Sequence, residues 1–135
     1  MRCAFAALLL CLTGTATAQS WGPRSLEELK QETIRRAERN MGPLAGIKAE
    51  DAREAMAGLK SLEPDEWAAA WSRVGERHLQ RGDYYQAWHS FNVARWPSER
   101  LSPGKQRAYA RALEAFQQYA RSLAQIGRAS CRERV

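Results

Sequence analysis

The fold is decided by the stretch from Asp65 to Pro97, which reads DEWAAAWSRVGERHLQRGDYYQAWHSFNVARWP. Its bulky side chains recur at intervals of four, three and four residues, which is the spacing of one helical face. These residues are Trp67, Trp71, Val74 and His78. Gly82 and Asp83 interrupt the pattern, and a glycine followed by an N-capping residue marks the boundary between two helices. The stretch therefore predicts two helices joined by a tight turn.

The order of small and large residues in this helix pair resembles the tetratricopeptide repeat. The residues that carry the resemblance are Trp71, Val74, Gly75, His78, Ala87, Phe91 and Ala94. Val74 and His78 depart from the leucine and tyrosine of the repeat. We expect Gly75 and Ala87 to let the helices approach closely, with Trp71 and Phe91 filling the space between them. An array needs about three stacked repeats, so the sequence predicts a single hairpin embedded in a small helical bundle.

Three further helices are expected, two before the hairpin and one after it. The first begins after Ser25, which lies three residues before a glutamate as in a capping box, and ends before the helix-stop cluster at residues 40–43. The second runs from Ala49 to Leu62, and the last begins at Ser102 with a proline in its first turn. No useful length of the chain alternates with period two. We therefore predict an all-α fold of about five helices without a sheet.

The N-terminal residues 1–18 have the features of a secretory signal peptide. A basic residue precedes a short apolar run, and small residues lie one and three positions before Gln19, which predicts cleavage between Ala18 and Gln19. The apolar run is shorter than the roughly 20 residues that span a bilayer. We therefore expect a secreted or periplasmic protein that has no membrane contact after cleavage.

The C-terminal residues 126–135, IGRASCRERV, resemble the codon-by-codon translation of a widely used short-read sequencing adapter. We expect this tail to be non-native, so that the native helical region comprises residues 19–125. Without both ends the chain keeps 17 basic and 14 acidic residues, and its net charge falls from +6 to +3. This balance gives no support to a nucleic-acid partner.

The expected chemistry of the remaining segment is limited. Its cysteines, Cys3, Cys11 and Cys131, all lie in the two ends, so we expect no thiolate metal site and no other metal or cofactor. No nucleophile elbow, zinc-binding helix motif or nucleotide-binding loop occurs in the sequence. We expect His78 to pack in the core, His89 to be exposed, and the cluster at residues 50–54 to form a solvated acidic face. No residue is predicted to be catalytic.

Three blocks of the sequence resemble a known enzyme family. The blocks DEWAAAW (65–71), GDYYQAW (82–88) and FNVARWP (91–97) are similar to the helical N-terminal region of α/β-hydrolases of the fermentation-respiration-switch esterase and pseudooxynicotine hydrolase type. The resemblance implies that the helices cover a catalytic α/β domain later in the same chain, which would bind a small-molecule substrate. The residues that it suggests for the wall of a substrate pocket are Trp67, Trp71, Trp88 and Trp96. The tetratricopeptide pattern supports an alternative, a periplasmic tetratricopeptide-like helical module that binds another protein.

Overall fold

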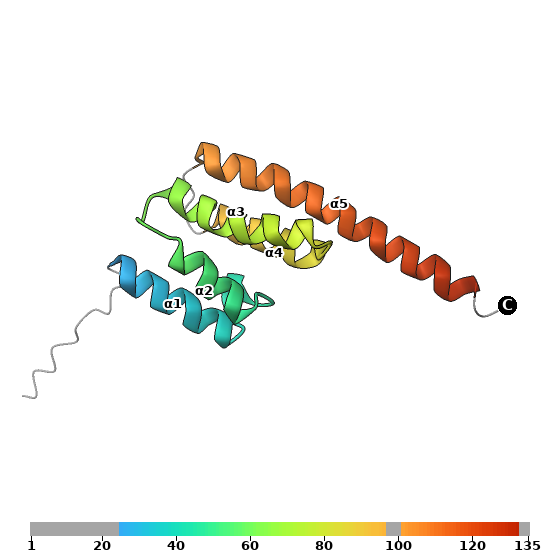
Figure 1. Cartoon of the computed structure of the whole chain (residues 1–135), viewed down its shortest axis with the longest axis horizontal. Coiled ribbons are helices and arrows are strands. Elements are labelled where there is room, and N and C mark those ends of the chain that lie inside the picture. The colour runs from blue at the N-terminus through green and yellow to red at the C-terminus, as the bar shows by residue number, and fades with distance from the viewer. Residues whose placement is uncertain (1–24, 97–100, 133–135) are drawn as a thin grey trace, which may run out of the picture.

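The computed structural model describes residues 25–96 and 101–132, with side chains described up to Gln125. Its elements are α1 (Leu26–Glu38), the 3-10 helix η1 (Gly42–Leu44), α2 (Ala49–Ala57), α3 (Pro64–Gln80), α4 (Tyr84–Arg95) and α5 (Pro103–Arg132) (Figure 1). These two ranges contain no β-strand, and the predicted all-helical fold is confirmed. The expected cleavage site between Ala18 and Gln19 lies outside the described residues.

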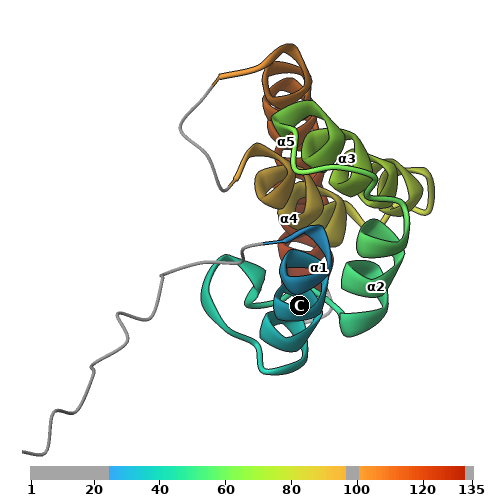
Figure 2. The same cartoon turned by 90° about the vertical axis from the view of Figure 1, so that its left-hand side faces the viewer.

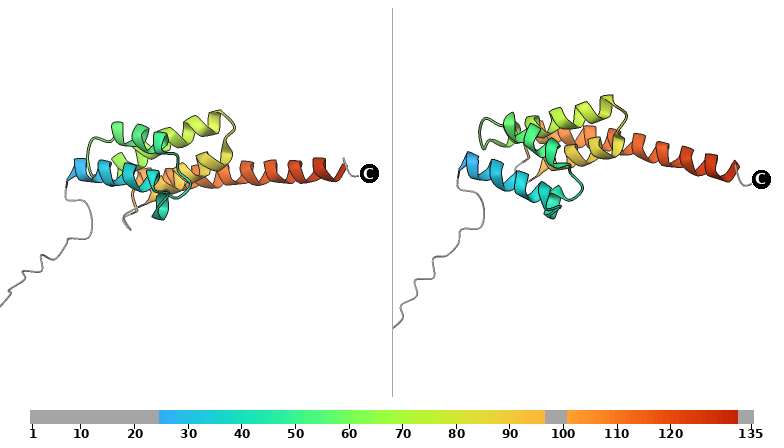
Figure 3. Two further views of the ribbon diagram at one scale, coloured as in Figure 1. Left: turned by 90° about the horizontal axis from the view of Figure 1, so that it is seen from below. Right: turned by 60° about the horizontal axis from the view of Figure 1, so that its bottom comes forward.

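The helices form a bundle in which α3 and α4 lie between the α1–α2 pair and α5 (Figure 2). The chain reverses at the short turn after α3, so α4 runs back along it, and α5 then packs against both helices of this hairpin. The C-terminal half of α5 projects beyond the rest of the bundle (Figure 3). No described helix combines the length and the apolar character that a bilayer crossing requires.

Three helices begin at side-chain N-caps that the sequence marks. The hydroxyl of Ser25 accepts the N–H of Glu28 at 3.1 Å, and the carboxylate of Asp83 accepts the N–H of Gln86 at 3.5 Å. The hydroxyl of Ser102 accepts the N–H of Lys105 at 3.4 Å. Each bond satisfies a backbone donor that has no partner within its own helix, which fixes where these helices start.

The ends of α1 and α3 share one capping motif. After α1, Asn40 takes a positive φ of 54° and the N–H of Met41 donates to the carbonyl of Arg36 at 2.9 Å. After α3, Gly82 has a φ of 75° and the following N–H donates to the carbonyl of His78 at 3.0 Å. This is the Schellman arrangement, which asparagine and glycine tolerate best. It turns the chain back toward the bundle at both places.

The second helix is shorter than predicted: α2 ends at Ala57, whereas we expected it to continue to Leu62. Beyond this point the guanidinium of Arg73, from α3, donates to the carbonyl of Gly58 at 3.2 Å. A Cβ at Gly58 would lie 2.1 Å from the same guanidinium, so a side chain at this position would displace Arg73 from the carbonyl. Leu59 then turns into the core, whereas Leu62 is exposed.

The last helix extends past Gln125, the residue at which we expect the native helical region to end. Its backbone is helical to Arg132 and so continues through most of the expected non-native tail at residues 126–135. A helical backbone does not test the origin of the coding DNA, and the assignment of this tail stays a prediction.

Candidate functional site

The residues that carry the hairpin pattern meet in the core between α3 and α4. All of them are buried: Trp71, Val74, Gly75, His78, Ala87, Phe91 and Ala94. A Cβ at Gly75 would lie 2.8 Å from ring atoms of Phe91, closer than van der Waals contact allows. The absence of a side chain at Gly75 therefore makes the space that the Phe91 ring fills.

The four tryptophans suggested for a pocket wall do not converge on one site. Trp67 and Trp71 lie in the core with ring centroids 5.9 Å apart, and the Trp67 indole donates to the carbonyl of Val93 at 2.8 Å. Trp88 is half-buried between α4 and α5, and Trp96 is exposed at the end of α4. Trp88 and Trp96 therefore have appreciable exposed surface, whereas Trp67 and Trp71 are buried.

A buried ionic cluster lies where α2, α3 and the turn after α3 meet. The imidazole of His78 lies between two carboxylates, with Nε2 2.9 Å from Asp51 and Nδ1 3.2 Å from Asp83. The guanidinium of Arg77 binds the other Asp51 oxygen at 2.5 Å and also Glu54 at 2.8 Å. The hydrogen bond to Asp51 raises the pKa of Arg77 above its usual value.

The cluster shows that one residue of the expected solvated acidic face is buried, and that His78 lies in the core as expected. Glu50 and Glu54 are exposed as expected, but Asp51 is buried with only 2% of its surface exposed. Both ring nitrogens of His78 lie within 3.2 Å of a carboxylate oxygen, one from α2 and one from the turn after α3. His78 thereby fastens α2 to the hairpin.

A cluster of rings covers the junction between α4 and α5, and we call it the aromatic cluster. Its members are Tyr85, Trp88, His89, Phe116 and Tyr119. The ring centroids of Tyr85 and Tyr119 are 5.4 Å apart and those of Trp88 and Phe116 are 5.5 Å apart, distances at which aromatic side chains attract each other. These contacts join two helices that are distant in sequence.

His89 is part of the aromatic cluster and is not the exposed residue that we expected. Its ring centroid lies 5.3 Å from that of Tyr85 and 5.4 Å from that of Trp88. Burial lowers the pKa of His89 below its usual value. The i, i+3, i+4 spacing of Tyr85, Trp88 and His89 carries this signal in the sequence, but the partner rings on α5 do not follow from it.

The solvent side of α5 continues this surface as an exposed apolar stripe. Large apolar side chains recur along the helix at intervals of four, three and seven residues and are each about half exposed. We call them the α5 stripe: Tyr109, Leu113, Phe116 and Leu123. Heptad spacing of this kind forms a seam that pairs with another apolar surface. The α5 stripe and the adjoining aromatic cluster together form the candidate docking surface.

The described residues offer no group of three or more histidine, cysteine, aspartate or glutamate side chains placed to hold a metal ion. Comparison of the chain with protein-family models, with curated proteins and with solved structures gives no match. The resemblances to the hydrolase family and to the tetratricopeptide repeat therefore stay predictions from the residues.

Proposed function

We propose that this chain is the helical covering region of an exported serine-type α/β-hydrolase and that it has no catalytic activity of its own. The observation that carries this proposal is the α5 stripe. Phe116 and Leu113 expose almost half of their surface, and Leu123, further along the same helix, is 49% exposed. Exposed apolar patches on folded domains mark surfaces that another partner covers.

The covering role assigns different tasks to the tryptophans. Trp67 and Trp71 hold the bundle together from its core, while Trp88 lies beside the stripe through its contact with Phe116. A wall of rings and aliphatic side chains would exclude water from a neighbouring catalytic site and shape an apolar pocket there. The nucleophile, base and oxyanion-binding groups would come from the catalytic domain.

A second candidate is an exported tetratricopeptide-type module that binds another protein. It is favoured by the packing of α5, which contacts both helices of the α3–α4 hairpin as the first helix of a following repeat would. This candidate uses the same exposed surface, but it requires further repeats of about 34 residues instead of a catalytic domain.

The exposed stripe predicts that the chain binds a fluorescent dye that reports apolar surface. Replacing Leu113 and Phe116 together with glutamate should lower the dye fluorescence roughly threefold, because the centre of the patch is removed. The matched control is Gln117→Glu with Gln125→Glu, which adds the same charge to exposed positions of α5 and should leave the fluorescence unchanged. Equal fluorescence for the chain and the Leu113/Phe116 variant would contradict the docking surface.

A further inference from the structure

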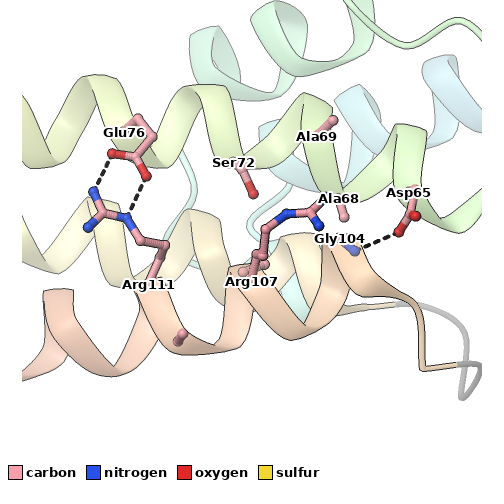
Figure 4. A pocket seen from close by; sticks show the side chains of 10 residues that line it. Asp65, Ala68, Ala69, Ser72, Glu76, Gly104, Arg107 and Arg111 are labelled. Atoms are coloured by element: carbon pink, nitrogen blue, oxygen red, sulfur yellow. Dashed lines mark hydrogen bonds and ion pairs between the residues drawn. The ribbon is translucent and has the colours of Figure 1, made fainter.

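A hollow of about 440 Å³ lies between α3 and α5, on a different part of the surface from the α5 stripe. Two polar contacts hold the helices together at its ends (Figure 4). At one end the carboxylate of Asp65 accepts the N–H of Gly104 at 2.8 Å. At the other end the guanidinium of Arg111 donates to Glu76, with Nε 2.6 Å from one carboxylate oxygen. The two helices therefore run parallel along the hollow.

The hollow stays open because the side chains between these contacts are small. Its floor and walls are formed by Ala68, Ala69, Ser72 and Ala108. At Gly104 even a Cβ would lie 3.2 Å from the Cβ of Ala68, so the helices are as close as they can pack at that end. Among the side chains that line the hollow between these contacts, only that of Arg107 is larger than serine. The result is a trough with an apolar floor and with charged groups along its edges.

The charged side chains that line the hollow include one guanidinium without a direct hydrogen-bonded partner among the described residues. Glu76 is matched by Arg111, which also binds Glu114 outside the hollow. Hydrogen bonds from Ser102 and Gly104 lower the pKa of Asp65, and the positive charges of Arg107 and Lys105 lower it further. Within the part of the chain that the structure describes, no hydrogen bond or ion pair involves the guanidinium of Arg107, which extends over the alanines of the floor (Figure 4).

Ser72 adds a second polar group with unused capacity. Its hydroxyl lines the hollow and makes no hydrogen bond to any of the described residues, although a helical serine often bonds to the carbonyl one turn earlier. A guanidinium binds a carboxylate through two parallel hydrogen bonds, and a hydroxyl can donate a third. The alanines beside them are suited to an aliphatic chain.

We propose that this hollow binds a small aliphatic carboxylate, with the carboxylate on Arg107 and Ser72 and the alkyl chain along Ala68, Ala69 and Ala108. The fit depends on charge and shape together. A trough of this size lies within the range of small-molecule sites, roughly 300–1,000 Å³. The site does not depend on the proposed covering role, because it lies away from the α5 stripe.

The test is a titration of the full chain with hexanoate, followed by the amide NMR signals of α3 and α5. We expect saturable shifts around Ser72 and Arg107 with a Kd on the order of 1 mM, and at least about tenfold weaker binding of hexan-1-ol, which has the same tail without the charge. Equal binding of the acid and the alcohol would overturn the proposal.

Three variants separate this site from general attraction of anions. Arg107→Gln should weaken hexanoate binding about tenfold, and Ala69→Leu should block the hollow and abolish the shifts. Arg121→Gln, which removes the same charge from an exposed position of α5, should leave the Kd unchanged. Unchanged affinity in the Arg107 variant, or equal weakening in the Arg121 variant, would overturn the proposal.

Discussion

Replacing Trp71 with alanine is expected to lower the free energy of unfolding by about 3–5 kcal/mol. The side chain is fully buried and packs against Trp67 in the core, so its loss leaves a cavity that the surrounding helices only partly close. Small domains have a total stability of about 5–15 kcal/mol, and the variant should therefore be close to unfolding. Urea denaturation followed by far-ultraviolet circular dichroism measures the change.

The matched control for this prediction is Trp96→Ala. It removes the same side chain from the exposed end of α4 and should change the free energy of unfolding by no more than about 0.5 kcal/mol. A loss below about 1 kcal/mol at Trp71, or equal losses at both positions, would contradict the packing of the hairpin.

Replacing Asp51 with asparagine is expected to lower the free energy of unfolding by about 3 kcal/mol. The substitution keeps the volume of the side chain but leaves the buried imidazole of His78 and the guanidinium of Arg77 without the carboxylate that both contact. The control is Glu50→Gln on the same helix, whose one ion pair is exposed and should contribute less than about 1 kcal/mol.

A double-mutant cycle assigns this loss to the ionic cluster. Combining Asp51→Asn with His78→Gln should cost less than the sum of the two single changes, by about 1–3 kcal/mol, because each change alone breaks the same contact. Strictly additive losses would show that Asp51 and His78 do not interact, and would contradict the role given to His78 in fastening α2 to the hairpin.

The sequence predicts the helices well where the signals are local. The caps at Ser25, Asp83 and Ser102 and the stop at Gly82 act through backbone groups within a few residues, so the starts of α1, α4 and α5 and the ends of α1 and α3 agree with those expected. Past the end of α2, Arg73 from the next helix donates to the carbonyl of Gly58, and Leu59 is buried in the core. No pattern within residues 49–62 contains that information, which is why the prediction extended too far.

The candidate sites were less predictable because they depend on pairs that are distant in sequence. Asp51 belongs to an acidic cluster that the sequence predicts to be a solvated helix face. Its partner His78 lies 27 positions later in the chain. The hollow beside Arg107 exists because α3 and α5 approach at alanines and glycine, which have no distinctive pattern. The α5 stripe is visible as apolar spacing, but its exposure follows only from the bundle.

The proposed covering role is tested most directly by reading the coding DNA of the locus past the codon for Gln125. We expect an open frame that continues into an α/β domain with a Gly-x-Ser-x-Gly nucleophile elbow within about 200 codons. A frame that continues instead as helical repeats of about 34 residues, or that reaches a stop codon without such an elbow, would contradict it.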